Sequence, residues 1–330
     1  MLLSIVLLAV GLAILIGGAD LLVRGVSSLA ERFGVPPLVV GMTVVAFGTS
    51  TPELVLNTLA AVKGETGLAF GNIVGSCAIN IGFVLALTAI IRPLIVETVL
   101  IIRELPMMLL GVASIVVMAE DHLSGGPRDE LVRADGIMLL LVFGVFLYYT
   151  IFAALGRKKT DAFMVEVAEQ AEKHKPRPPW IDTGLIIIGI AGVAGGGRLA
   201  LAQAVSIASS MGVPDSLIGF TLVSFGTTLP ELATCITAAR RGQSDIALGN
   251  VVGSNIFNLL FIGGVVATIH PMAIPPGGHG DVALMAGLSA ALLPIAIRGP
   301  RRITRGEGVF LLIAYLSYVV YRATTTGSSN

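Results

Sequence analysis

One stretch of sequence occurs twice: PLVVGMTVVAFGTSTPEL spans residues 37–54, and DSLIGFTLVSFGTTLPEL spans residues 215–232. The same shift of 178 residues places GNIVGSCAIN (71–80) over GNVVGSNIFN (249–258). Around these segments the two copies align without a gap over 47 positions and share 20 identities. Unrelated segments of this length match at only a few positions, so the sequence contains an internal duplication.

Composition places most of the chain in lipid. Of 330 residues, 55% are hydrophobic and only 13% are charged, and the mean hydropathy is +0.90. Soluble proteins carry roughly twice this charged fraction. Lys and Arg number 21, as do Asp and Glu, so no basic excess points to a nucleic-acid partner. The two cysteines, Cys77 and Cys235, lie in apolar runs and are expected to be buried thiols rather than a disulfide.

Apolar stretches long enough to cross a bilayer, about 20 residues each, predict an all-α integral membrane protein with ten transmembrane helices. They fall near residues 2–30, 36–62, 66–91, 94–118, 135–155, 182–210, 215–240, 244–269, 281–298 and 306–322. The first stretch lacks a basic n-region and a cleavage site, so we expect a retained helix rather than a signal peptide.

The duplication divides the predicted helices into two sets of five. The first repeat covers 1–155 with the motif at 36–82, and the second covers 182–330 with the motif at 214–260. A linker, 156–181, joins them. An odd number of helices separates the copies, so the second copy is expected to be upside down relative to the first, which is the plan of many secondary transporters. Channels can also contain inverted repeats, so the symmetry alone does not distinguish a transporter from a channel.

Basic residues predict the orientation in the membrane. With the N-terminus outside, 16 Lys and Arg fall on inner segments and 5 on outer segments. The positive-inside rule then predicts that both termini are outside, and that the linker is cytoplasmic. The expected location is the inner, or plasma, membrane of the cell.

The duplicated helices carry residues that a lipid-facing helix avoids. Gly48 and Pro52 precede Glu53, and Gly226 and Pro230 precede Glu231 in the second copy. Gly and Pro weaken the helical hydrogen bonds, so we expect the second and seventh helices to be broken here. A carboxylate at membrane depth costs several kcal/mol unless it has a partner, which makes each glutamate a candidate functional group. Two such carboxylates brought together require a bound cation or protonation.

The third and eighth helices add neutral oxygen ligands, and they too are expected to be broken. In each copy a Ser and an Asn are four residues apart and so lie on one helix face: Ser76 and Asn80 in the first copy, and Ser254 and Asn258 in the second. We expect them to coordinate an ion opposite the glutamates. Asn72 and Asn250 come one turn earlier and are expected to fix backbone geometry.

Oxygen ligands alone indicate a hard cation. Ca²⁺ accepts six to eight oxygens of mixed type, whereas Mg²⁺ retains its waters and uses fewer protein ligands, so Ca²⁺ is favoured. Two carboxylates also balance the charge of one Ca²⁺. Further oxygens are available from four hydroxyl groups and two backbone carbonyls: Thr49, Ser50, Thr227, Thr228, Ala46 and Ser224.

The motifs GMTVVAFGTSTPEL…GNIVGS and GFTLVSFGTTLPEL…GNVVGSNIFN resemble the two α-repeats of the Ca²⁺/cation antiporter superfamily, in its prokaryotic sodium/calcium exchanger branch. The resemblance implies alternating access, with Ca²⁺ exchanged for Na⁺ at overlapping sites. It implies that twelve of the residues named above hold the ions: Ala46, Thr49, Ser50, Glu53, Ser76, Asn80, Ser224, Thr227, Thr228, Glu231, Ser254 and Asn258. It also implies that the first and sixth helices slide. Five glycines of these helices would suit close, mobile contact: Gly17, Gly18, Gly195, Gly196 and Gly197. It implies no enzyme activity, no cofactor and no obligatory protein partner.

One position departs from this family. Well-studied sodium/calcium exchangers have Asp where this chain has Asn258. Ca²⁺/H⁺ exchange, in which Glu53 and Glu231 trade protons for Ca²⁺, therefore remains an alternative. Outside the duplicated motifs, Asp20 and Arg24 are expected to form an i,i+4 ion pair on the first helix.

Overall fold

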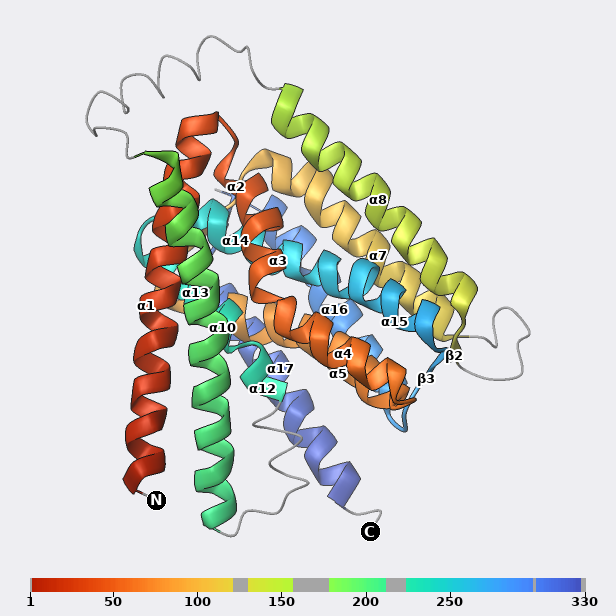
Figure 1. Ribbon diagram of the computed structural model, residues 1–330. Coiled ribbons are helices and arrows are strands. Elements are labelled where there is room, and N and C mark those ends of the chain that lie inside the picture. Colours follow the sequence, from red (N-terminus) through yellow and green to blue (C-terminus); the bar gives the residue numbers. More distant parts are fainter. Residues whose placement is uncertain (1, 121–129, 157–177, 212–223, 299–300, 328–330) are drawn as a thin grey trace. The chain divides into compact units, whose positions relative to one another are not determined.

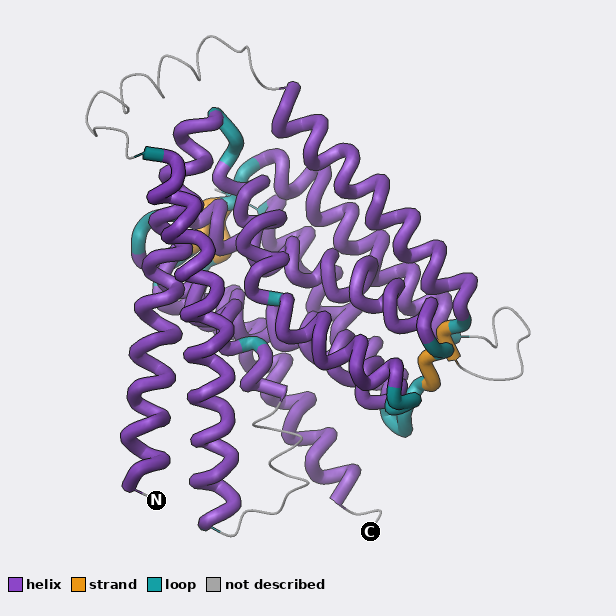
Figure 2. Tube along the Cα trace, in the orientation of Figure 1, coloured by secondary structure: helices purple, strands orange, loops and turns teal. Residues whose placement is uncertain are grey.

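The computed structural model describes residues 2–120, 130–156, 178–211, 224–298 and 301–327. Helices make up most of it, and strands are confined to two short ladders (Figures 1 and 2). The predicted linker therefore lies largely outside the described residues, as do residues 215–223 of the seventh predicted span.

Seven of the described helices are long and apolar enough to cross a membrane, or eight if the bent pair Pro37–Thr49 and Thr51–Val62 counts as one span. The seven are Leu2–Phe33, Thr66–Ile91, Leu100–Ala119, Arg133–Phe152, Pro179–Ser210, Ser244–Ile269 and Gly278–Ile297. The helix at the tenth predicted span, α17 (Arg305–Gly327), is not one of the seven. These findings confirm an all-helical membrane protein.

The chain divides into two compact units, each discontinuous in sequence. The first contains residues 1–49 and 144–250, and the second contains 50–143 and 251–330. Elements within the first unit are α1 (Leu2–Phe33), α2 (Pro37–Val40), η1 (Gly41–Val45), α3 (Ala46–Thr49), α10 (Pro179–Ser210), α12 (Ser224–Thr227) and α13 (Leu229–Arg240). Two helices, α8 (Arg133–Gly156) and α14 (Ser244–Ile256), contribute residues to both units.

The first unit is built on the close packing of α1 against α10, which lie side by side in Figure 1. A Cβ added to Gly18 would lie 2.6 Å from the backbone nitrogen of Val193, and one added to Gly196 would lie 2.4 Å from that of Leu15. Only glycine allows the two backbones to come this close. Gly11 contacts Ala200, whereas Gly18, later in α1, contacts Val193, earlier in α10. The two helices are therefore antiparallel. Gly195, in contrast, has nothing within 4 Å of an added Cβ.

The second unit packs its helices around α5 and α17. It consists of α4 (Thr51–Val62), α5 (Thr66–Ile79), η2 (Asn80–Leu85), α6 (Ala86–Ile91), β1 (Leu94–Ile95), η3 (Leu100–Glu104), α7 (Leu105–Ala119), β2 (Glu130–Leu131), η6 (Phe257–Ile262), α15 (Gly263–Ile269), β3 (Met272–Ala273), α16 (Gly278–Ile297), β4 (Arg302–Ile303) and α17. Helix α5 packs against α4, α16 and η6, and α17 packs against α6 and η2. Gly82 makes the last contact possible, because an added Cβ would lie 2.5 Å from Cβ of Tyr315.

Two antiparallel ladders tie distant parts of the second unit together. β1 pairs with β4, placing Leu94 opposite Ile303, and β2 pairs with β3, placing Leu131 opposite Met272. All four of these side chains are buried. Each ladder therefore joins one strand from the first half of the sequence to one from the second half.

The predicted breaks in the second and seventh helices are present. Ser50 separates α3 from α4, and Thr228 separates α12 from α13. The two residues have nearly the same backbone dihedrals, φ −87° and ψ 5° for Ser50 and φ −92° and ψ 0° for Thr228. This sparsely populated region is frequent at functional sites. The Pro two residues later removes a backbone donor, so the helix restarts at this point rather than continuing.

The expected breaks in the third and eighth helices were wrong, because both helices are continuous. Thr66–Ile91 and Ser244–Ile269 each form one span. Each contains a π-helical segment instead, η2 beginning at Asn80 and η6 beginning at Phe257. A π-helical turn adds a residue without interrupting the helix, and such turns are frequent at functional sites. The glycines before these segments leave the helical hydrogen bonds intact.

Turns after α4 and α13 are also alike. Gly64 and Gly242 have positive φ values of 77° and 82°, a conformation that glycine adopts without strain. After them, the backbone nitrogen of Glu65 donates to the carbonyl of Ala60, and that of Gln243 donates to the carbonyl of Ala238. Equivalent positions of the two sequence copies therefore fold in the same way.

Candidate functional site

Glu53 lies in the first turn of α4, directly after the break. Its side chain is only 1% exposed. The N-terminus of a helix carries a partial positive charge, which stabilises a carboxylate there by about 0.3–1 kcal/mol, and by up to about 2 kcal/mol when partly buried. The break therefore provides a favourable position for a buried negative charge that an unbroken helix would not provide.

A hydrogen bond sets the register between α4 and α5. The side-chain amide of Asn57 donates to Oδ1 of Asn72 at 2.9 Å. The two helices form an antiparallel hairpin. The residue one turn before Asn57 therefore lies beside the residue one turn after Asn72. This register places Glu53 at the level of Ser76. Asn72 thus links the two helices through its side chain, and Asn57 is a contributor that the sequence pattern did not identify.

Residues from the second sequence copy complete this group within the second unit. The hydroxyl group of Ser50 lies 3.1 Å from that of Ser254. The amide of Asn80 donates to Oδ1 of Asn255 at 3.0 Å, and Asn255 donates to the carbonyl of Cys77 at 3.3 Å. Asn255 was missed because its repeat equivalent is Cys77, so no identity marks the position.

Several oxygens in this group have no hydrogen-bond donor among the described residues. They are Oγ of Ser76, Oδ1 of Asn80 and Oδ1 of Asn258, on side chains that are at most 2% exposed. A buried oxygen without a donor typically costs about 1–3 kcal/mol. These three oxygens come from α5, from η2, which continues α5, and from η6, which packs against α5. They are suitable ligands for a hard cation.

Glu231 occupies the matching position in the first unit. It lies in the first turn of α13, after the break at Thr228, and is 1% exposed. Thr227 and Thr228 are buried beside it in sequence, at 8% and 2% exposure. Thr234, one turn further along α13, is also fully buried, and its hydroxyl group has no partner among the described residues.

Asn250 joins the two broken helices within the first unit. Its Oδ1 accepts a hydrogen bond from the hydroxyl of Thr49 at 3.2 Å, and its amide donates to Sγ of Cys235 at 3.3 Å. Both bonds join side chains, so Asn250 links neighbouring helices. Cys235 takes the place that Asn57 holds in the other copy. Both cysteines are free and buried, as predicted.

The backbone carbonyls expected as ligands lie in the short helices before the breaks. The carbonyl of Ala46 accepts a hydrogen bond from the hydroxyl of Thr49 at 3.3 Å. In the second copy, the carbonyl of Phe225 accepts a hydrogen bond from the hydroxyl of Thr228 at 3.0 Å. Ser224 begins α12, at the edge of the described residues.

The predicted site residues therefore fall into two groups, one in each unit. Ser50, Glu53, Ser76, Asn80, Ser254 and Asn258 belong to the second unit, and Ala46, Thr49, Ser224, Thr227, Thr228 and Glu231 belong to the first. Each group contains one buried glutamate. Among the described residues, no cluster of three or more His, Cys, Asp or Glu side chains is suited to a metal.

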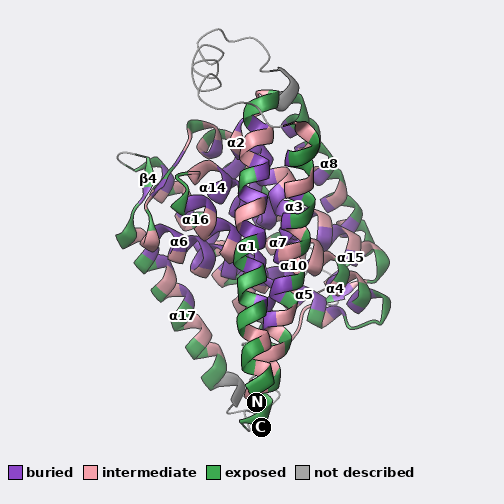
Figure 3. Ribbon diagram, turned by 60° about the vertical axis from the view of Figure 1, so that its left-hand side comes forward, coloured by how far each residue is buried: buried purple, intermediate pink, exposed green. Residues whose placement is uncertain are grey.

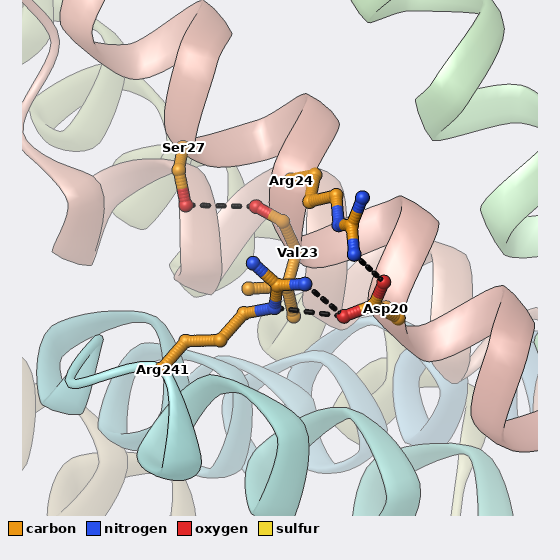
Figure 4. A network of polar contacts seen from close by, with 5 residues as sticks. All are labelled: Asp20, Val23, Arg24, Ser27 and Arg241. Carbon is orange, nitrogen blue, oxygen red and sulfur yellow. Dashed lines mark hydrogen bonds and ion pairs between the residues drawn. The ribbon is translucent and has the colours of Figure 1, made fainter.

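A separate polar network lies on α1 (Figure 4). Asp20 forms the predicted i,i+4 ion pair with Arg24, with 2.6 Å between the charged atoms. Asp20 also accepts a hydrogen bond from Nε of Arg241 at 2.8 Å, and Arg241 lies directly after α13. These side chains are 31–48% exposed, so each pair contributes about 1 kcal/mol at most. The contact with Arg241 could not be predicted from the sequence, because the two residues are 221 positions apart.

Apolar spanning helices that are interrupted beside buried carboxylates define a membrane transport protein for cations. The family model described as sodium/calcium exchanger protein matches residues 3–152 and 181–324. The chain therefore belongs to the sodium/calcium exchanger family, as its motifs predicted. It is a cation antiporter and not an enzyme, and membership of this family sets aside the channel alternative.

Relatives and a solved structure agree over nearly the full length. The inner membrane protein YrbG of Escherichia coli is 35% identical over 325 residues, covering 97% of this chain and 96% of YrbG. The sodium/calcium exchanger MaX1 of Methanosarcina acetivorans is 29% identical over 342 residues, covering 96% and 97%. A structure of the sodium-calcium exchanger NCX_Mj superposes with a TM-score of 0.82 at 31% identity, covering 97% of this chain and 99% of that one.

Proposed function

We propose that this chain exchanges Ca²⁺ for Na⁺ across the cell's inner membrane by alternating access, without a cofactor. Membership of the sodium/calcium exchanger family supports the pair of ions, as do the names of the relative MaX1 and of the structural neighbour NCX_Mj. The donor set supports a hard cation, because it consists entirely of oxygens.

The observation that carries this proposal is the group of buried acceptor oxygens on Ser76, Asn80 and Asn258 in the unit that holds Glu53. A cation replaces the hydrogen-bond donors that these oxygens lack. We propose that Glu53 and Glu231 are both Ca²⁺ ligands, since two carboxylates balance the charge of this ion. The full ligand set is Glu53, Glu231, Thr49, Ser50, Thr227, Thr228, Ser76, Ser254, Asn80 and Asn258, with the carbonyls of Ala46 and Ser224.

We also propose ten transmembrane helices arranged as two inverted repeats, 1–155 and 182–330, joined by a cytoplasmic linker. The nearly equal dihedrals at Ser50 and Thr228 support this arrangement. The contact between α1 and α10 supports it as well. Gly11 contacts Gly196, and their repeat equivalents, Gly189 and Gly18, also contact each other. A reciprocal contact of this kind is expected when two copies are related by a pseudo-two-fold axis.

The distribution of basic residues supports an orientation with both termini outside. Ca²⁺ release to the outside, driven by inward Na⁺ flow, then follows from the direction of the usual Na⁺ gradient.

Ca²⁺/H⁺ exchange is the second candidate, and Asn258 favours it. An amide at this position limits the acidic charge of the ligand set to Glu53 and Glu231. Protons can neutralise these two carboxylates when Ca²⁺ leaves, whereas several Na⁺ ions would need more negative charge. Na⁺ remains first because the family and the motifs around both glutamates are those of sodium/calcium exchangers.

Reconstituted vesicles separate these mechanisms. Proteoliposomes are loaded with Na⁺, choline or an acidic buffer, and radiolabelled Ca²⁺ is added outside with the membrane potential clamped at zero or at a set negative value. Uptake that requires internal Na⁺ supports the proposal. Uptake that follows the proton gradient and ignores Na⁺ identifies the second candidate. Uptake that needs neither gradient and follows the membrane potential alone contradicts antiport.

A further inference from the structure

One end of the second unit carries a concentration of arginines. Six arginines gather where β1, β4, the end of α6 and the start of α17 meet: Arg92, Arg103, Arg298, Arg301, Arg302 and Arg305. Five of the six are exposed, and the side chain of Arg103 is 32% exposed. Three glutamates share this end. Glu104 is buried and paired with Arg103, and Glu307 accepts hydrogen bonds from Thr304. The third is Glu97, so arginines outnumber glutamates by two to one at this end.

Hydrogen bonds hold Arg301 and Arg305 at this end of the unit. The backbone nitrogen of Val96 donates to the carbonyl of Arg301 at 2.8 Å. The guanidinium group of Arg301 donates to the hydroxyl of Thr98, and Nε of Arg305 donates to the carbonyl of Ile90 at 3.1 Å. Arg301 has a φ of 52°, the only positive value at a non-glycine position among the described residues. Such a backbone is strained, so the surrounding contacts must compensate for it.

The ladder separates a buried apolar face from an exposed face that is both basic and apolar. Leu94 and Ile303 are opposite one another and buried. Ile95 and Arg302 are also opposite one another, but exposed, so they share the outer face. Ile297, one residue before Arg298, is 57% exposed. Figure 3 shows β4 on the same edge as α6, with exposed segments around it.

The other end of the second unit has the opposite charge balance among its described residues. Acidic side chains outnumber basic ones there by five to three. The basic residues are Lys63, Arg133 and Arg322, and the acidic residues are Glu65, Glu120, Glu130, Asp135 and Asp281. Arg322 is paired with Asp281. The concentration of arginines is therefore specific to one end and is not a general property of the unit.

We propose that the outer face of the β1–β4 ladder, with the arginines around it, is a docking surface for the headgroups of anionic phospholipids. Guanidinium groups bind phosphate strongly, and basic clusters at the ends of spanning helices recognise anionic lipid. The exposed side chains of Ile95 and Ile297 beside the arginines match the acyl chains of the same lipid. A soluble phosphate would make no use of these apolar side chains.

The double variant Arg298→Gln/Arg302→Gln tests this proposal. Neither side chain forms a hydrogen bond or ion pair within the part of the chain that the structure describes, so the fold is expected to persist. The protein is reconstituted in phosphatidylcholine with spin-labelled phosphatidylglycerol, and the motionally restricted fraction is measured. We expect the unsubstituted protein to prefer phosphatidylglycerol over labelled phosphatidylcholine. The variant should lose this preference by about fivefold for each arginine removed.

Lys63→Gln/Arg133→Gln removes the same charge from the opposite end and serves as the matched control. It should retain the preference. An equal loss in this control, or an unchanged preference in the Arg298→Gln/Arg302→Gln variant, contradicts the proposal. Displacement of the labelled lipid by millimolar glycerol 3-phosphate also contradicts it, because the surface would then be a site for soluble phosphate. Thermal unfolding of both variants checks that the fold is intact.

Discussion

At the scale of single residues, Glu53 and Glu231 are equivalent in sequence and in local structure. Each lies two residues after a Thr or Leu that opens a new helix, and each is 1% exposed. The helix N-terminus favours the charged form, but its contribution is much smaller than the cost of burying a charge at membrane depth. A bound cation or a proton would lower this cost, so ion binding and the charge of each glutamate are expected to be coupled.

Glu53→Gln and Glu231→Gln are each expected to abolish Ca²⁺ transport, lowering the rate at least a hundredfold. An amide keeps the shape of the side chain but removes the charge that balances Ca²⁺. The measurement is Ca²⁺ uptake into proteoliposomes, with size-exclusion chromatography and thermal unfolding as controls for folding. Normal transport by both single variants would mean that these glutamates do not hold the ion.

Asn258→Asp is expected to change the dependence on Na⁺ more than the affinity for Ca²⁺. A third carboxylate would stabilise additional bound Na⁺, whereas Ca²⁺ is already balanced by two. The Hill slope for Na⁺ should rise, measured as Ca²⁺ uptake against internal Na⁺ concentration. Asn80→Asp, at the equivalent position of the other copy, is the matched comparison. An unchanged Na⁺ slope together with a strongly altered Ca²⁺ affinity would refute this assignment.

At the scale of elements, the α1–α10 seam depends on particular glycines rather than on glycine content. Gly195, Gly196 and Gly197 are consecutive, yet each faces a different environment. Gly196 packs against the backbone of α1, Gly197 lies near Pro230, and Gly195 has no neighbour within 4 Å of an added Cβ. The sequence predicted close contact for this run but could not say which glycine makes it, because that depends on how the two helices are rotated.

Gly196→Ala and Gly195→Ala should therefore differ sharply. An added methyl group at Gly196 would lie 2.4 Å from the backbone nitrogen of Leu15, and overpacking of this kind costs about 1–3 kcal/mol. At Gly195 the same change meets open space and gains up to about 1 kcal/mol from helix propensity. Thermal unfolding in detergent should show a lower midpoint for Gly196→Ala and an equal or higher one for Gly195→Ala. Equal midpoints would contradict the packing described for this seam.

The helix breaks show how far sequence reasoning reaches at this scale. The breaks at Ser50 and Thr228 were predictable because Pro52 and Pro230 each remove a backbone donor. The same reasoning failed for Thr66–Ile91, where glycine lowers helix propensity without removing a donor, and the helix continues through η2. Asn57 and Asn255 were also missed as contributors, since their repeat equivalents are cysteines and the pattern of identities does not mark them.

At the scale of the whole molecule, hydropathy located the spanning helices that the structure describes, seven of the ten predicted or eight if the bent pair counts as one span. The 178-residue shift relates elements of the two sequence copies in pairs. The ladders were not predictable, because strands of two residues leave no periodicity to detect. Their pairing nevertheless follows the repeat. β1 and β3 are separated by the same 178-residue shift, and each pairs with a strand from the opposite half of the sequence.

Inversion of the two copies makes a prediction that local structure cannot. The turns after α4 and α13 have the same hydrogen bonds, with Glu65 and Gln243 at matching positions. In an inverted pair, these turns lie on opposite sides of the membrane. Glu65→Cys and Gln243→Cys should therefore react with a membrane-impermeant maleimide from opposite sides of oriented vesicles, Glu65→Cys from the outside.

The unsubstituted chain is the control for this experiment, since Cys77 and Cys235 are buried and should not react. Labelling of both variants from the same side would contradict the inverted arrangement, although each turn would keep the structure it has here. Labelling from opposite sides, with Gln243→Cys reacting from the outside, would preserve the inversion and reverse the proposed orientation. The two outcomes separate the symmetry of the fold from its direction in the membrane, because symmetry is a consequence of the duplication and direction is a consequence of the arginines.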